Sequence, residues 1–266
     1  MKCTDQPHDI PEGLLNKLRQ IRRLVVFTGA GMSAESGIPT FRDPVYGLWE
    51  QFNPHDLASA EGWEEDRERV WAWYEWRRSV AIRVQPHAGH LALASLPQIL
   101  SAISGHDIVV DIVTQNVDDL HERAGSVNVQ HLHGSLFAPR CDRCAISGVF
   151  AEPPLQAAIP KLPPPKCQQC SGVMRPGVVW FGEDLPQDVW RRAEQMMMAA
   201  DMVLVVGTSG VVYPAASLPL RALENKTWVV EINPNETVLS NKVNLHWKIS
   251  AAEGLSTLCA FLNAKP

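Results

Sequence analysis

The stretch Val25–Ser33 limits what this chain can fold into more than any other part of the sequence. A short apolar run leads into Gly29-Ala30-Gly31, and a segment that favours a helix follows. A strand, a tight glycine turn and a helix start form a cradle whose backbone N–H groups and helix dipole attract an anion. Glycine also lets the backbone approach a pyrophosphate without an intervening Cβ. An ordinary strand-to-helix turn is the plainer interpretation, because glycine pairs are common in such turns.

The glycine turn departs from the usual dinucleotide pattern, G-x-G-x-x-G. The next glycine is Gly37, and no acidic residue follows about 20 residues later in a second strand. The pattern therefore predicts a nucleotide cradle, but not that of an ordinary dehydrogenase.

Short, nearly continuous apolar runs recur along the chain, as is typical of parallel strands covered on both faces. The expected strands are residues 22–28, 108–114, 202–206, 227–232 and 245–249. Helical stretches lie between them. The pattern predicts an α/β fold with a Rossmann-like, doubly wound parallel sheet.

Two insertions interrupt this pattern. Residues 44–86 are rich in tryptophan and mostly helical in character, whereas residues 138–176 contain four cysteines and a proline-rich run. The second segment is too polar and too rich in proline to belong to the main sheet. We expect a sheet domain made of residues 14–43, 87–137 and 177–262. We also expect a helical insertion over residues 44–86 and a small metal-binding module over residues 138–176.

Charge and hydropathy narrow the function classes. The 266-residue chain has a net charge of −5, which argues against a nucleic-acid groove as its main function. No apolar run approaches the roughly 20 residues of a membrane span, and the polar N-terminus lacks the apolar core of a signal peptide. We expect a cytoplasmic monomer that binds neither nucleic acid nor membranes.

Four of the six cysteines form two C-x-x-C pairs, Cys141 with Cys144 and Cys167 with Cys170, and the proline-rich run lies between the pairs. In a cytoplasmic protein such pairs indicate zinc rather than disulfides. Four thiolates close the coordination sphere, so the predicted zinc is structural. Four reduced cysteines without metal are one alternative, and a redox dithiol, which needs only one pair, is another.

Polar residues follow three of the expected strands. They are Gln115, Asn116 and Asp118; Gly207, Thr208 and Ser209; and Asn233 with Asn235. Ligands of doubly wound sheets gather at the carboxyl ends of the strands, so these residues are expected to meet the glycine turn in one crevice. The alternative for Asn116 and Asp118 is to cap a helix over residues 120–124.

Two histidines, His131 and His133, follow in the sequence His-Leu-His-Gly. Period-two spacing predicts that both lie on one face of a strand. A histidine can act as a base near neutral pH, although a lone histidine is more often structural.

In these motifs the chain resembles a sirtuin, an NAD-dependent protein-lysine deacylase. The resemblance covers residues 14–262 and rests on residues 29–42, 114–118, 133–134, the four cysteines, 207–209 and 233–235. It implies NAD as co-substrate and acylated lysine side chains of proteins as substrate. The acyl group would pass to ADP-ribose, giving nicotinamide, free lysine and 2′-O-acyl-ADP-ribose, while the zinc would take no part in the chemistry.

The resemblance also implies residue roles, with His133 rather than His131 as the general base. Phe41 and Arg42 would lie on a loop over NAD, Gln115 would contact a ribose, and Asn116 and Asp118 would line the nicotinamide pocket. The remaining NAD-binding residues would be Gly29, Ala30, Gly31 and Ser33 at the pyrophosphate, Gly207, Thr208, Ser209, Asn233 and Asn235 at the adenosine half, and Ala251 at the adenine.

The tryptophan-rich helix adds a prediction about the acyl group. On a helical wheel of residues 70–84, Arg77 falls in the middle of an apolar stripe, while Glu75 and Ser79 fall opposite. A charge in that place is costly unless it is paired. An internal salt bridge or a snorkelling stem is the plain explanation. Tyr74 and Arg77, however, are within reach of each other at i and i+3, and together they can hold a carboxylate.

Class III sirtuins carry this Tyr-x-x-Arg pair in the acyl pocket. The resemblance therefore implies a preference for succinyl-, malonyl- or glutaryl-lysine, and we expect acetyl groups to be removed as well. Residues 178–183 also resemble that class, and Val178, Val179 and Phe181 would pair with the substrate backbone as an added strand.

Two other functions remain open from the sequence. An ADP-ribosyltransferase shares the cleavage of NAD and differs only in the acceptor, and a non-catalytic NAD sensor would bind without turnover. The presence of His133 favours deacylation, and the presence of Asn116 and Asp118 as well disfavours a sensor.

Overall fold

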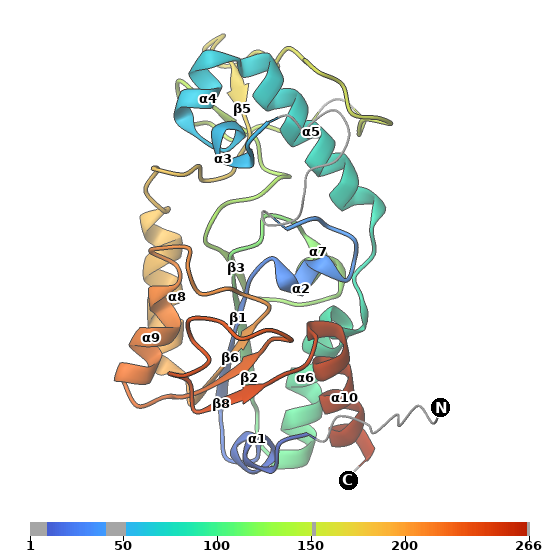
Figure 1. Cartoon of the computed structure of the whole chain (residues 1–266), viewed down its shortest axis with the longest axis vertical. Coiled ribbons are helices and arrows are strands. Elements are labelled where there is room, and N and C mark those ends of the chain that lie inside the picture. Colours follow the sequence, from blue (N-terminus) through green and yellow to red (C-terminus); the bar gives the residue numbers. More distant parts are fainter. Residues whose placement is uncertain (1–9, 41–51, 151–152, 265–266) are drawn as a thin grey trace.

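The computed structural model describes residues 10–40, 52–150 and 153–264. Phe41 and Arg42, two of the predicted NAD-binding residues, lie outside these ranges. Figure 1 shows a large part built on a sheet, with a smaller part of helices and loops above it. No helix among the described residues has the length and apolar character needed to cross a membrane.

The large part contains a six-stranded, wholly parallel sheet. Its strands are β1 (Arg23–Thr28), β2 (Val109–Thr114), β3 (Val129–His131), β6 (Met202–Val206), β7 (Trp228–Ile232) and β8 (Leu245–Trp247). They lie in the order β3-β2-β1-β6-β7-β8, which is the Rossmann order. The predicted fold class is confirmed, and all five expected strands are present. The expected strand through both histidines is wrong in one respect, because β3 ends at His131 and His133 lies in the turn beyond it.

Helices cover both faces of this sheet (Figure 1). Successive side chains of a strand point to opposite faces, so Leu24 and Val26 of β1 belong to one core cluster and Val25 and Phe27 to another. The first face is covered by α1 (Glu12–Leu18), α6 (Ala88–Ser104) and α10 (Ala251–Ala264), and the second by α8 (Gln187–Ala199) and α9 (Ser217–Glu224). The strands are apolar throughout because neither face meets water.

The smaller part has a separate core cluster. It comprises α3 (Pro54–Leu57), α4 (Ala60–Glu65), α5 (Arg67–Arg83) and the antiparallel pair β4 (Arg140–Cys141) and β5 (Met174–Arg175). Trp63 of α4 contacts Trp180 with ring centres 5.6 Å apart, which ties α4 to the segment after β5.

Helix α5 is buried more completely than its sequence pattern predicts. Glu75 and Ser79, expected on an outer face, are 3% and 0% exposed. Glu75 forms a 2.8 Å ion pair with buried Arg78, and the Arg78 guanidinium lies 4.1 Å from the centre of the Phe150 ring. The outer face is covered because a segment distant in sequence, which contains Phe150, packs on it.

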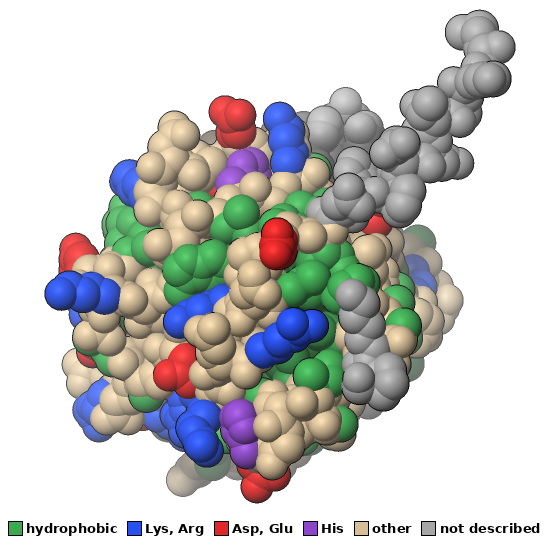
Figure 2. Space-filling model, turned by 90° about the horizontal axis from the view of Figure 1, so that it is seen from below, with side chains coloured by type: hydrophobic (Ala, Val, Ile, Leu, Met, Phe, Trp, Pro, Cys, Tyr) green, Lys and Arg blue, Asp and Glu red, His purple; other side chains and the backbone are tan. Residues whose placement is uncertain are grey.

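Two short helices place loops at the carboxyl ends of the strands: α2 (Gly31–Ala34) follows β1, and α7 (Leu120–Arg123) follows β2. The lower face of the molecule, beyond the amino ends of the strands, is shown in Figure 2. On that face acidic and basic side chains are interspersed among apolar ones. The chemically distinctive groups lie at the other end of the sheet.

Candidate active site and zinc module

A cavity of about 720 Å³ lies between the two parts of the molecule. Its wall contains every predicted cofactor, substrate and catalytic residue that the structure describes. These residues are Gly29, Ala30, Gly31, Ser33, Tyr74, Arg77, Gln115, Asn116, Asp118, His133, Val178, Val179, Phe181, Gly207, Thr208, Ser209, Asn233, Asn235 and Ala251. Segments from near both ends of the chain thus meet in one cavity.

The glycine turn after β1 packs directly against the turn after β6. The Gly31 N–H donates to the Gly207 carbonyl oxygen at 2.8 Å, and a Cβ on Gly31 would lie 2.7 Å from that oxygen. Gly207 has a φ of +60°, and a Cβ there would lie 2.4 Å from the Met32 nitrogen. Only glycine fits at either position. The two turns therefore form a bare backbone surface at the carboxyl ends of two neighbouring strands.

Side chains link the ends of three strands. The Gln115 amide after β2 donates to the Thr208 hydroxyl after β6 at 2.9 Å. The Asn233 amide after β7 donates to the Thr208 carbonyl oxygen at 3.0 Å. The Asn116 amide donates to the Ser33 hydroxyl in α2 at 3.0 Å. The structure thus brings the predicted polar groups together with the glycine turn.

Asp118 lines the cavity beside the start of α7. Its Oδ1 accepts from the Leu120 N–H at 3.1 Å, but the N-cap of α7 is Asp119, so the capping alternative is wrong in its residue. Its side chain is buried, and burial raises its pKa although the Leu120 N–H and nearby His131 lower it. Asn116 does not cap α7, since its side-chain amide contacts Ser33 instead.

The two histidines have different surroundings. His133 lines the cavity, and its Nδ1 lies 3.0 Å from the Gln115 carbonyl oxygen. A carbonyl accepts only, so Nδ1 carries the proton and Nε2 keeps its lone pair. Burial lowers the pKa of His133 below its usual value, although the bond to Gln115 opposes this shift. The neutral ring is therefore available near pH 7.

His131 lies outside the cavity wall. Its Nδ1 is 2.9 Å from the Asn116 carbonyl oxygen, and its Nε2 is 2.7 Å from the Glu122 carboxylate. Burial lowers the pKa of His131, but the bond to Glu122 raises it above the usual value overall. His131 is thus a structural partner of two acceptors rather than an open base.

Helix α5 supplies the wall of the cavity in the smaller part. Tyr74 is 4% exposed, and burial raises its pKa to about 12. The Arg77 guanidinium lies 4.9 Å from the Trp73 ring centre and 5.6 Å from that of Tyr74. Burial also lowers the pKa of Arg77, while Tyr74 and Asp118 oppose the shift. A cation and a phenol therefore lie side by side in an aromatic wall.

Several wall residues were not singled out from the sequence. They include Glu35, Trp73, Trp76, Leu136, Tyr213 and Thr237. Trp73 lies on the apolar stripe with Arg77, so the helical wheel carried a signal for it. Leu136 follows the His-Leu-His-Gly motif, and no local pattern marks it as part of the cavity.

The segment from Val178 to Glu183 is held by its own side chains. Arg175 forms ion-paired hydrogen bonds of 2.6 and 3.0 Å with Glu183, and its guanidinium lies 3.4 Å from the Trp180 ring centre. The backbone N–H groups of Val179 and Phe181 donate to His133 and Ala58. A peptide added along this segment would use the remaining backbone groups.

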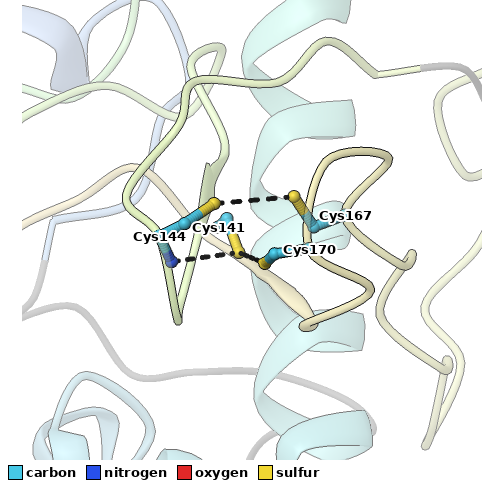
Figure 3. Close-up of side chains that lie close together, drawn as sticks. All are labelled: Cys141, Cys144, Cys167 and Cys170. Carbon is cyan, nitrogen blue, oxygen red and sulfur yellow. Dashed lines mark hydrogen bonds between the residues drawn. The ribbon is translucent and has the colours of Figure 1, made fainter.

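The four cysteines cluster beside α5 (Figure 3). Their sulfur atoms all lie within 4.8 Å of one another. The Cys141–Cys170 and Cys144–Cys167 separations are 3.5 and 3.8 Å, far longer than the roughly 2.05 Å of a disulfide. This arrangement fits a single tetrahedral zinc ion.

The two C-x-x-C turns have the same local geometry. Ala145 N donates to the Cys141 carbonyl and Ser171 N to the Cys167 carbonyl, both at 3.0 Å, and Ala145 and Ser171 both have a φ of +58°. The Arg143 and Cys144 N–H groups also point at the Cys141 sulfur, and such outer contacts orient a metal ligand. All four protein positions are filled, so the site is structural.

Comparison with known proteins decides the family. The Sir2 family model matches residues 29–214. The chain belongs to the Sir2 family. The resemblance seen in the sequence is thereby confirmed.

Family relatives match along nearly the whole chain. The NAD-dependent protein deacylase of Corynebacterium glutamicum is 48% identical over 248 residues, which cover 92% of this chain and 93% of the relative. The protein of the same name from Mycobacterium tuberculosis H37Rv is 47% identical over 242 residues, covering 91% and 98%.

Solved Sir2 structures have the same fold. The crystal structure of a Sir2 homologue–NAD complex has a TM-score of 0.85 at 43% identity and covers 97% of this chain and 96% of its own. A Sir2 structure bound to a propionylated peptide has a TM-score of 0.76 at 28% identity, with coverage of 94% and 97%. The first of these proteins is bound to NAD and the second to an acylated peptide.

Proposed function

We propose that this chain is an NAD-dependent protein-lysine deacylase that prefers acyl groups ending in a carboxylate, such as succinyl and malonyl, and also removes acetyl. The single observation that supports the preference most is the position of Tyr74 and Arg77 in the wall of the cavity that also holds the glycine turns and His133. One cavity thus contains a nucleotide cradle, a free imidazole nitrogen and a cationic end.

NAD fits the bare backbone surface formed by the glycine turns. The backbone N–H groups and the helix start after β1 suit a pyrophosphate. The absence of Cβ atoms at Gly31 and Gly207 lets the two turns pack against each other and so form this surface. The nicotinamide half would lie toward Asn116 and Asp118, and the adenosine half toward Asn233 and Ala251. Bound NAD supplies an electrophilic ribose carbon that takes the acyl oxygen as nicotinamide leaves.

His133 is the residue placed to move a proton. Its Nδ1–H is fixed on the Gln115 carbonyl, so its Nε2 can accept a proton from a ribose hydroxyl in the cavity. Its lowered pKa keeps this nitrogen free at neutral pH. His131 cannot take this role, because acceptors face both of its ring nitrogens.

Arg77 and Tyr74 would bind the far end of the acyl chain. A guanidinium forms a forked pair with a carboxylate, and a phenol hydroxyl adds a hydrogen bond. The phenol of Tyr74 stays protonated at any physiological pH, since its pKa is about 12. A succinyl carboxylate would bring a negative charge to the half-buried Arg77 guanidinium, whereas an acetyl group carries no charge.

The zinc module would support the acyl pocket from outside. Asp142, between the cysteines, accepts from the Trp63 indole N–H at 3.1 Å, and Cys141 and Cys167 pack in the same core cluster as Trp73 and Tyr74. The ion would hold the two knuckles together and thereby brace α4 and α5. It supplies no reacting group.

The test is nicotinamide release by the purified protein with NAD and three matched peptides, carrying unmodified, acetyl- and succinyl-lysine. We expect release with both acylated peptides, faster with succinyl, and none with the unmodified peptide. Release that does not depend on acylation would favour an ADP-ribosyltransferase. NAD binding without any release would favour a sensor.

A further inference from the structure

His131 was singled out in the sequence, but the deacylase chemistry gives it no role. It ends β3, and its side chain is 19% exposed. Its two ring nitrogens meet two acceptors from different segments, the Asn116 carbonyl oxygen at 2.9 Å and the Glu122 carboxylate at 2.7 Å. The ring thus bridges the segment after β2 and helix α7.

Neither acceptor can supply the proton of its hydrogen bond. A backbone carbonyl has no proton to donate. Partial burial raises the pKa of Glu122, but the bond from His131 lowers it below the usual value overall, so the carboxyl group is ionised. Both nitrogens of His131 must therefore donate, and a ring that donates from both nitrogens is an imidazolium.

The Asn116 carbonyl lies at a critical point of the cavity wall. Asn116 is tied through its N–H to the Thr114 hydroxyl at 3.0 Å and through its amide to Ser33. The preceding carbonyl, that of Gln115, orients His133. The bond from His131 is a third tether on Asn116, and it acts from outside the cavity wall.

We propose that His131 is a positioning residue that, as an imidazolium clamped between Asn116 and Glu122, holds the segment Gln115–Asp118 in its NAD-binding arrangement, and that its charge favours the ionised form of Asp118. The activity part of this inference rests on the proposed function. The charge state of His131 does not.

The charges around His131 agree with this role. Glu122 and His121 face it from α7, and Asp118 faces it from the preceding segment. Burial raises the pKa of Asp118, and the positive ring opposes that shift. Helix α8 also packs on β3, but it supplies none of the charged groups that shift the pKa of His131. Loss of the second proton would break one of the two bonds and remove the charge that favours ionised Asp118.

The direct test is nitrogen-15 NMR of the histidine rings in the wild-type protein. We expect both nitrogens of His131 to be protonated at pH 7, while His133 is neutral with its proton on Nδ1. In Glu122→Gln the carboxylate charge is lost, so the titration of His131 should move to lower pH. A neutral His131 at pH 7 would overturn the proposal, whatever the enzyme does.

A second test measures the positioning effect in His131→Gln. NAD affinity by calorimetry should fall about tenfold, as expected for one lost charge-assisted hydrogen bond, while KM for the acyl peptide stays the same. In the pH profile of deacylation, the alkaline limb should disappear because the residue that loses a proton there is gone. The acid limb should move to higher pH because Asp118 loses its positive neighbour. If the folded variant kept the NAD affinity and the pH profile of the wild type, the positioning role would be contradicted.

His106→Gln is the matched control. His106 lies at the amino ends of the strands. Like His131, it has an acceptor at each ring nitrogen, here the backbone carbonyls of Ser104 and Ile21. We expect this variant to keep wild-type NAD affinity and pH limbs. If it shifted them as His131→Gln does, the effect would be general destabilisation and the proposal would fail. Because NAD affinity is read without turnover, a protein that lacks deacylase activity would still test it.

Discussion

The two halves of the cavity are built in different ways. The cofactor half consists of strand ends, where the positions of Gly31, Gly207 and Thr208 follow from the backbone of a parallel sheet. The acyl half consists of side chains on α5, such as Tyr74 and Arg77, which depend on packing in a separate core. In the proposed function, the first half carries chemistry that does not vary with the acyl group, and the second selects among acyl groups. Each prediction below disturbs one half or the core that supports it.

The largest effect is expected in the cofactor half. His133→Ala should lower kcat for deacylation about 10²- to 10⁴-fold with acetyl and succinyl peptides alike, because it removes the proposed base. NAD affinity measured by calorimetry should stay near the wild-type value. Turnover close to wild type with either peptide would show that His133 is not the base.

The next effect concerns the support of the acyl half. Cys167→Ala should lower the zinc content from one ion per chain toward zero and lower the free energy of unfolding by about 4 kcal/mol or more, as losses of a metal site do. Metal analysis and thermal melting measure both quantities. Cys259→Ala, at a buried cysteine of α10 outside the cluster, should keep its zinc. A stable, fully active Cys167→Ala protein without zinc would contradict the bracing role.

Acid should weaken the sheet side of the molecule. Burial lowers the pKa of His90 to about 2 and that of His121 to about 4, below the value near 6.5 expected in the unfolded chain. The folded state therefore binds fewer protons, so stability is complete above pH 6.5 and is lost as the pH falls below it. Between pH 6.5 and 5 each of the two histidines should lower the free energy of unfolding by about 2 kcal/mol.

Urea unfolding at several pH values measures this loss. His121→Gln has no group at that position that titrates in this window, so the variant should lose about half of the pH dependence. An identical pH dependence in wild type and variant would show that His121 does not carry it.

The smallest effect is expected from Tyr74→Phe in the acyl half. The ring and its packing remain, and only the hydroxyl is lost. The loss of one hydrogen bond is worth about 1 kcal/mol, so kcat/KM for a succinyl peptide should fall roughly fivefold. Deacetylation should hardly change. Equal losses with both peptides would mean that the hydroxyl holds the wall of the pocket rather than the acyl carboxylate.

The sequence was informative where local pattern decides the structure. Continuous apolar runs predicted five strands, and the polar residues after them predicted where the strand ends meet, because parallel strands end at one edge. Asp118 shows the limit of such reasoning, since the N-cap of α7 is the neighbouring Asp119, while Asp118 lines the cavity and accepts from the Leu120 N–H. The order of the strands in the sheet is not a local property, and no pattern in the sequence predicted it.

The errors occurred where distant segments decide the structure. Glu75 and Ser79 were expected on an open helix face, but Phe150 and its neighbours cover that face, and helical periodicity cannot detect a contact with a segment so distant in sequence. The strand through His131 stops before His133, because its partner β2 ends at Thr114, which pairs with His131. The bridge from His131 to Glu122 likewise depends on the meeting of β3 and α7, which no spacing in the sequence announces.

The most direct test of the division between the two halves is kcat/KM for matched succinyl- and acetyl-lysine peptides in wild type and Arg77→Met. Loss of a charge-assisted pair is worth about 1.5–3 kcal/mol, so the variant should lose about 10- to 100-fold on succinyl and little on acetyl, with NAD affinity unchanged. An equal loss on both peptides, or none on succinyl, would contradict the account, because Arg77 would then be a structural cation of α5 and not the selector of the acyl group.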